Sequence, residues 1–200
     1  AVLTTTQVAA FSTSQIQGLS ATDIQELSAT QVSAFTRTQM VRLGTESVAA
    51  LDATQIEAIA SSVIQALNST QIGALEAADI AEFTTTQLAA LTTNQVRALN
   101  TTHVGGLTTE QVSSMTSTQL LAMSSTNLSA LDANQAASLT TTQLRALSTS
   151  QLAGLDADDV AEFTTTQIGA LTNTQAQGLT STQMSGLAET QREAFTTTQF

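Results

Sequence analysis

The sequence predicts an all-α fold: an α-solenoid of about 25 eight-residue repeats, each forming one short capped helix. Three observations support this prediction. The octad recurs in phase, and twenty-four complete copies run from Thr4 to Phe195. Apolar residues recur at two positions of the octad, and a helix-capping pattern accompanies them. No linker or change in composition interrupts the repeat, so residues 1–200 are predicted to form a single continuous array.

Residues 84–91, Thr-Thr-Thr-Gln-Leu-Ala-Ala-Leu, show the octad, numbered here from position 1 to position 8. Position 1 is usually Ser, Thr, Asp or Asn, position 4 is usually Gln, and position 8 is a large apolar residue in every complete copy. Position 5 is aliphatic or Met except at Ala136, Ala176 and Arg192. Position 7 is Ala, Gly or Ser except at Glu26, Arg42, Glu82 and Glu162. Small residues at position 7 indicate that neighbouring backbones approach closely.

Each octad begins with the signals of a helix start. Ser or Thr followed three residues later by Gln is a capping box, in which the hydroxyl accepts a backbone N–H and the Gln side chain reaches back. Position 8 of the previous octad and position 5 then form the hydrophobic staple at the helix entrance. Each octad therefore predicts a helix of about two turns that the next cap ends. The octads that begin at Gly44 and Ala60 lack both the cap and the Gln, which we interpret as drift.

Two other folds compete with this prediction. In one long helix the apolar spacings of 3 and 5 would average 4 residues per turn, so no single face could stay buried. A β-solenoid is the alternative that stays open, because Thr, Val and Ile favour strands. Strands alternate with a period of two residues, however, and neither Gly nor Asn recurs in phase to form corners. The solenoid of short helices is therefore favoured.

The composition narrows the classes of function. Only 3% of the residues are aromatic and 10% are charged, and the chain has no Cys, Pro or Lys. A net charge of −11 argues against binding to nucleic-acid backbones and anionic membranes. No apolar run approaches the roughly 18 residues of a membrane span. We therefore expect neither a nucleic-acid partner nor membrane insertion.

The sequence also repeats with a period longer than the octad. Residues 76–91 match residues 156–171 at an offset of 80 residues, so ten octads form a super-repeat. The chain opens at octad position 6 and stops at position 5, so Ala1 placed after Phe200 would complete an octad in phase. This predicts either a window of a longer array or subunits that stack head to tail, with Ala1, Val2, Leu3 and Phe200 at the joint.

Acidic residues supply the one candidate metal site. Carboxylates at positions 1, 4 and 7 share a helix face and could converge on a calcium ion; they are Asp156, Asp159 and Glu162, and Glu76, Asp79 and Glu82. Acids at positions 1 and 4 also suit a helix N-terminus, as caps and against the helix dipole. The loop spacing and the central glycine of calcium-binding loops are absent, so capping is the favoured interpretation.

The residues form no catalytic or cofactor-binding pattern. His103 replaces the usual Gln of its octad and has no partner motif, so we interpret it as a substituted capping residue. The arginines are scattered, and no phosphate-binding loop or nucleophile motif appears. We expect no enzyme activity and no cofactor.

The octad, as it stands in residues 84–91, resembles the Thr-, Gln- and Ala-rich octapeptide-repeat regions of giant bacterial cell-surface and biofilm proteins. The resemblance covers the whole chain, implies an exported, extracellular structural role and carries over no binding residues. With the low-charge surface, it leads us to expect an extracellular filament or surface fibre whose partner is a further copy of the chain. The alternative is a binding module, such as an adhesin stalk that contacts surface glycans or an ice-binding Thr array.

Overall fold

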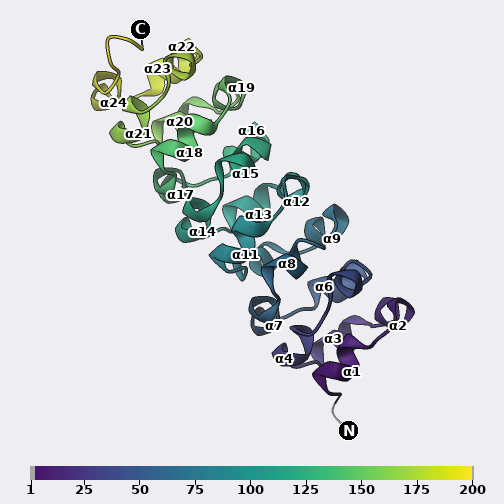
Figure 1. The fold of residues 1–200 in the computed structure, drawn as a ribbon. Helices are drawn as coiled ribbons and strands as arrows, with labels where there is room; N and C mark the ends of the chain where they lie inside the picture. Colours follow the sequence, from purple (N-terminus) through teal and green to yellow (C-terminus); the bar gives the residue numbers. More distant parts are fainter. Residues whose placement is uncertain (1–2, 200) are drawn as a thin grey trace. The chain divides into compact units, whose positions relative to one another are not determined.

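A computed structural model describes residues 3–199 of the 200-residue chain. Within this range the chain forms α-helices of four to six residues and no β-strand, with one helix in nearly every octad (Figure 1). The all-α prediction is confirmed, and the β-solenoid alternative is wrong. The chain divides into two compact units, Ala1–Gly106 and Leu107–Phe200, and each is described by itself. The prediction of one continuous array over residues 1–200 stays a prediction.

The helices follow the octads in both units. The first unit contains α1 (Thr5–Ala9), α2 (Thr13–Gln17), α3 (Ala21–Gln25), α4 (Ala29–Val32), α5 (Arg37–Met40), α6 (Thr45–Ala49), α7 (Ala53–Ala58), α8 (Ser61–Ile64), α9 (Ser69–Gly73), α10 (Ala77–Ala81), α11 (Thr85–Ala90), α12 (Thr93–Ala98) and α13 (Thr101–Gly105). The second contains α14 (Thr109–Ser114), α15 (Ser117–Ala122), α16 (Ser125–Leu128), α17 (Ala133–Ser138), α18 (Thr141–Ala146), α19 (Thr149–Ala153), α20 (Ala157–Ala161), α21 (Thr165–Gly169), α22 (Asn173–Gln177), α23 (Ser181–Gly186) and α24 (Glu189–Glu193).

The predicted capping box forms at the start of most helices. At α11 the Thr84 hydroxyl accepts the Gln87 backbone N–H at 3.1 Å, and the Gln87 side-chain oxygen accepts the Thr84 backbone N–H at 2.9 Å. The helices that follow Gly44 and Ala60 have no side-chain cap, as their sequences predict. Caps at both ends of an octad keep each helix short, because the next cap residue has extended backbone angles.

Position 5 and position 8 side chains form the core of each unit. Ile72, Leu88 and Leu144, at position 5, are 0% exposed, whereas position 8 residues such as Leu91 are about 4% exposed. A helix of five residues buries too little apolar surface to be stable alone, so each octad depends on its neighbours.

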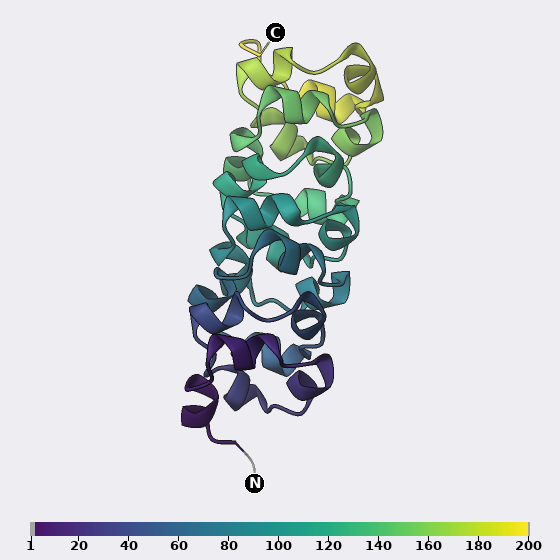
Figure 2. The same ribbon diagram turned by 90° about the vertical axis from the view of Figure 1, so that its right-hand side faces the viewer.

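Each unit is built by winding the chain so that helices three apart in sequence pack together. α1 packs on α4, α9 on α12 and α10 on α13 in the first unit; α14 packs on α17 and α20 on α23 in the second. Figure 2 shows the result, in which segments distant in sequence lie in adjacent layers of each unit. Helices three octads apart are thus neighbours, and hydrogen bonds described below reach the octad four before. One turn of the winding therefore takes between three and four octads.

Position 7 is where adjacent turns come closest. A Cβ atom added to Gly154 would lie 2.7 Å from Ser125 Cβ, and one added to Gly186 would lie 3.0 Å from Ala157 Cβ. Both contacts join position 7 to position 2 of an octad 29 residues earlier. The small residues at position 7 therefore have the close backbone approach that the sequence predicts.

Candidate functional site

A series of glutamine side chains, here called the glutamine ladder, joins the turns within each unit. The Gln87 amide nitrogen donates to the Ile56 carbonyl and to the Ile59 carbonyl, both at 2.7 Å. These acceptors lie 31 and 28 residues earlier, at positions 5 and 8 of the octad four before. Glutamines that bond in this way to an earlier turn include Gln31, Gln39, Gln55, Gln71, Gln87 and Gln95, and Gln135, Gln143, Gln151, Gln167, Gln175, Gln183, Gln191 and Gln199.

Each ladder glutamine makes two kinds of hydrogen bond, and only the first kind was predictable from the octad. The side-chain oxygen caps its own helix, and the side-chain nitrogen binds the turn before. Gln87 is only 2% exposed, so these bonds satisfy a buried polar group. A capping box accepts Glu as readily as Gln. Gln is the commonest residue at position 4 and Glu never occurs there, which is the signal that a donor is needed.

Four octads outside the acidic pairs have another residue at the ladder position, namely Ser47, Val63, His103 or Asn127. The Ser47 hydroxyl donates to the Leu19 carbonyl at 2.7 Å. His103 is 2% exposed; its Nδ1 accepts the Asn100 backbone N–H at 3.2 Å, so its Nε2–H donates to the Leu75 carbonyl at 2.8 Å. His103 is thus a capping residue that also serves as a ladder donor. Val63 has no side-chain donor for this purpose.

Three other octads carry an acidic pair, defined as Asp at position 4 with Glu at position 7. The pairs are Asp23 with Glu26, Asp79 with Glu82 and Asp159 with Glu162. The two substitutions occur only together: no other octad has Asp at position 4 or Glu at position 7. A change at one position is therefore coupled to a change at the other.

The Asp of each pair caps its helix. Asp79 Oδ2 accepts the Glu76 backbone N–H at 2.7 Å, and Asp159 Oδ2 accepts the Asp156 backbone N–H at 2.9 Å. Asp159 Oδ2 also accepts the Ser129 hydroxyl at 2.6 Å. Among residues 3–199 no group of three or more His, Asp or Glu side chains could hold a metal ion. Asp79 and Asp159 therefore serve as helix caps, and the calcium site stays a prediction.

The carboxyl groups of the pair Asp79–Glu82 have raised pKa values. Burial raises the pKa of Asp79, with a further contribution from the Glu76 charge. Burial also raises the pKa of Glu82, and the charges of Asp79 and Asp52 raise it further. The Glu82 Oε2 atom is buried and has no hydrogen-bond partner in the described part of the chain. The ionised form of this side chain therefore has one carboxylate oxygen that is neither solvated nor hydrogen-bonded.

In the second unit Glu162 behaves like Glu82. Burial raises the pKa of Glu162, followed by the charges of Asp159 and Asp132. Asp23 differs, because no described octad lies 28 residues before it and it is exposed. Hydrogen bonds from the Ser20 backbone N–H and hydroxyl lower the pKa of Asp23. The preceding turn therefore accounts for the opposite behaviour of Asp79.

The predicted assembly joint is described only at Leu3. The Leu3 side chain is 39% exposed, and its carbonyl accepts the Gln31 amide nitrogen at 2.6 Å. Ala1, Val2 and Phe200 lie outside the described residues. The joint stays a prediction.

Comparison with known families identifies the repeat. The family model described as ALTTAQ repeat matches residues 72–109, 80–117 and 137–173. These letters correspond to octad positions 7, 8, 1, 2, 3 and 4, as in Ala-Leu-Thr-Thr-Asn-Gln at residues 90–95. No curated protein matches the chain. The chain is a helical repeat protein; its resemblance to giant bacterial surface proteins stays a prediction. No helix within residues 3–199 has the length and apolar character to cross a membrane.

Proposed function

We propose that this chain is a structural component of an extracellular or cell-surface fibre, in which repeat arrays join end to end and pack side by side. The observation that carries the proposal is the uniform register of the glutamine ladder. Each turn offers backbone carbonyls to the next turn and takes up the carbonyls of the turn before through its Gln amides. Further octads in phase can extend such an array with the same bonds, whether they belong to the same chain or to another copy.

The first turn has the features that such an extension would use. Gln7 and Gln15 are exposed, although they occupy the ladder position. The position 8 side chains of this turn line a hollow of about 370 Å³ together with acidic and Gln residues; its lining is Leu3, Phe11, Leu19, Asp23, Glu26, Leu27 and Gln31. Octads packed on this turn would bury these apolar side chains and supply carbonyl acceptors to the exposed amides.

The outer surface supports lateral packing. Positions 1 to 3 carry mainly Ser and Thr, and in α11 and its cap Thr84, Thr85 and Thr86 are all exposed. With charged residues at only 10% of the sequence, two such surfaces repel each other weakly and can share hydroxyl hydrogen bonds.

Sedimentation velocity and cryo-electron microscopy of the purified chain over a range of concentrations test the proposal. We expect fibres in which the octad register continues across the joints. Gln15→Glu removes an exposed ladder amide and should shorten or abolish the fibres. The matched control is Gln17→Glu, which adds the same charge at an exposed position outside the ladder and should assemble normally. A monodisperse monomer at high concentration would contradict the proposal.

A binding module is the second candidate, because the exposed Thr and Ser side chains recur in every turn. It predicts retention on surface glycans, or inhibition of ice growth, by protein that forms no fibres. Either result without assembly would transfer the assignment to this candidate.

A further inference from the structure

The acidic pairs interrupt the glutamine ladder at defined places. By the register of the other rungs, a Gln at position 79 would reach the carbonyls of Val48 and Leu51. A Gln at position 159 would reach those of Leu128 and Leu131. Aspartate is one methylene shorter, and an ionised carboxylate has no proton to donate. These two rungs therefore lack the amide donor of the Gln rungs, although at the second the Ser129 hydroxyl donates to Asp159 Oδ2 across the turns at 2.6 Å.

The missing rung of the second unit leaves a space. A cavity of about 10 Å³ lies beside Asp159, and its lining includes Leu128, Leu131 and Glu162 among mostly apolar side chains. Such a volume is close to that of one water molecule. In the first unit the corresponding observation is that the Glu82 Oε2 atom is buried and has no hydrogen-bond partner among the described residues. Both places contain a carboxyl oxygen that a proton could turn into a donor.

The charged groups around Glu82 are nearly all acidic. Glu76 and Asp79 stand on its own octad, and Asp52 and Glu57 face it from the turn before. The next turn, α13, contributes His103, whose ring contacts the Asn100 backbone N–H through Nδ1 and the Leu75 carbonyl through Nε2. No arginine contributes to the shift of Glu82. A proton is therefore the simplest means of reducing the crowded negative charge.

The charged groups that act on Glu162 are also acidic. Asp156, Asp158 and Asp159 belong to its own octad, and Asp132 faces it from the turn before. The helix packed on the other side, α23, carries no titratable residue. The two sites are 80 residues apart in sequence, so each unit contains one.

We propose that the pairs Asp79–Glu82 and Asp159–Glu162 act as donors of the ladder only when they carry a proton. When the pair takes up a proton from water, the carboxylic O–H donates to an acceptor of the preceding turn, and the turns are joined. When the proton leaves, this bond is lost and the carboxylates repel, although at Asp159 the Ser129 hydroxyl still donates across the turns. The Gln rungs do not titrate, so acidification tightens the array at these two places only.

The raised pKa values of Glu82 and Glu162 agree with this geometry and determine the direction in which stability changes with pH. A carboxyl whose pKa is higher in the folded chain stabilises the fold fully at pH values below its unfolded pKa. This contribution is lost as the pH rises through the folded pKa. The inference depends on the ladder register and not on fibre formation, so it can fail or hold independently of the proposed function.

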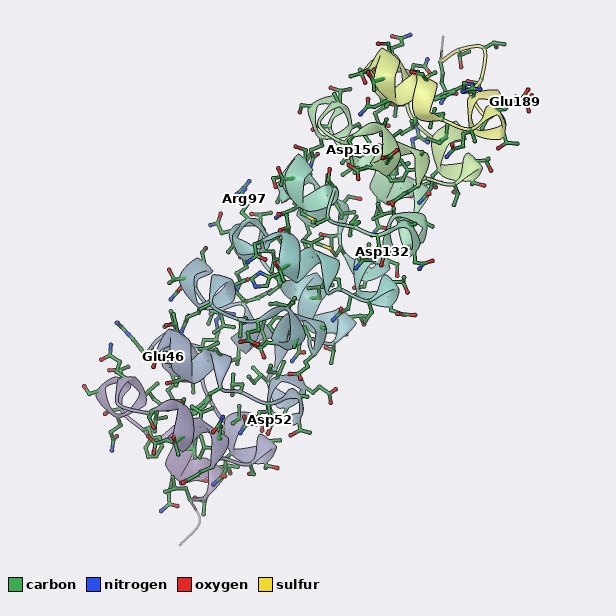
Figure 3. The ribbon with its side chains drawn as sticks, turned by 180° about the vertical axis from the view of Figure 1, so that it is seen from behind. Glu46, Asp52, Arg97, Asp132, Asp156 and Glu189 are labelled. Atoms are coloured by element: carbon green, nitrogen blue, oxygen red, sulfur yellow. The ribbon has the colours of Figure 1, made fainter. Side chains whose placement is uncertain are left out.

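The test uses the full chain with Glu82→Gln and Glu162→Gln combined, because Gln has the shape of a protonated Glu. Thermal unfolding followed by circular dichroism, with a chelator present, is compared with the parent chain between about pH 8 and pH 4. We expect the variant to melt several degrees higher at pH 8 and the difference to disappear at acidic pH. Glu46→Gln with Glu189→Gln is the control, since both side chains are exposed; it should show no such convergence. Figure 3 labels both residues.

A second variant guards against misfolding at the altered positions. Replacing each pair by the common residues, with Asp79→Gln and Glu82→Ala and with Asp159→Gln and Glu162→Ala, installs two ordinary rungs and should also melt higher at pH 8. Carbon-13 NMR titration of the parent carboxyls should place Glu82 and Glu162 above the exposed glutamates. Parallel melting profiles, or ordinary titration of both carboxyls, would overturn the proposal. A calcium-dependent rise in the parent melting temperature that the variants lose would overturn it as well, because the pairs would then bind a cation.

Discussion

The side-chain amide of Gln87 donates to the backbone carbonyl of Ile59 at 2.7 Å, across 28 residues of sequence. The same side chain accepts the Thr84 backbone N–H through its oxygen. One residue thus begins a helix and attaches it to the turn before. Because the octad repeats, this local unit becomes the long-range connection of the array.

Replacing Gln87 by Leu should lower the free energy of unfolding by about 1–3 kcal/mol, because the buried Ile56 and Ile59 carbonyls lose their amide donor. Urea unfolding followed by circular dichroism measures the change. Gln17→Leu, at an exposed position outside the ladder, is the control and should stay within about 0.5 kcal/mol. Equal effects of the two substitutions would mean that the ladder bonds contribute nothing.

Two adjacent leucines separate core from surface. Leu120 is 1% exposed at position 5, whereas Leu121 is 52% exposed at position 6. Leu120→Ala should cost about 2–5 kcal/mol through the lost burial and the cavity left behind. Leu121→Ala should change the stability by less than about 0.5 kcal/mol. A large loss with Leu121→Ala and none with Leu120→Ala, measured by urea unfolding, would reverse the assignment of the core positions.

Two glycines should respond oppositely to a methyl group. Gly154→Ala places a Cβ 2.7 Å from Ser125 Cβ, so two turns must separate and the melting temperature should fall. In Gly73→Ala the nearest atom is the Ala98 carbonyl oxygen at 3.7 Å, an ordinary contact. Because Gly is costly within a helix, this change should stabilise the chain by about 0.5–1 kcal/mol. Thermal unfolding of both variants checks the prediction, which a higher melting temperature for Gly154→Ala would contradict.

Asp23 and Asp79 occupy the same octad position but should show opposite pH dependence. The pKa of Asp23 is lowered in the fold, so its stabilisation is present above the unfolded pKa and is lost as the pH falls through the folded pKa. Asp23→Asn should therefore melt below the parent at neutral pH and match it in acid.

The pKa of Asp79 is raised, so its stabilisation is present in acid and is lost as the pH rises through the folded pKa. Asp79→Asn should melt above the parent at neutral pH and converge with it in acid. Melting curves between about pH 2 and pH 8 compare the two variants. The same slope for both would show that the preceding turn does not affect the ionisation of Asp79.

The local features of the octad were predictable, since the signals lie within a few residues of each other. Thr84 and Gln87 encode the cap, and Leu88 and Leu91 mark the buried positions. The small residues at position 7 indicated close backbone contact, which Gly154 confirms. The second bond of Gln87 was missed, because its acceptors are backbone carbonyls that have no side-chain signature.

The acidic residues show the limit of sequence reasoning most clearly. Asp79 and Asp159 were predicted to cap their helices, and they do. The burial of Glu82 Oε2 was not predictable, because position 7 on an isolated helix would be solvated. The charge of Asp52 on the turn before reaches it only through the packing of the turns.

The sequence by itself determined where each helix begins and ends and which of its faces is apolar, because caps and apolar spacing act over a single octad. The tertiary structure alone decided that between three and four octads complete a turn, and therefore which carbonyls each Gln reaches and which carboxyls lose water. The physical reason is that the angle between successive short helices depends on how position 5, 7 and 8 side chains of neighbouring turns pack. That packing is a property of several octads together and of none of them alone.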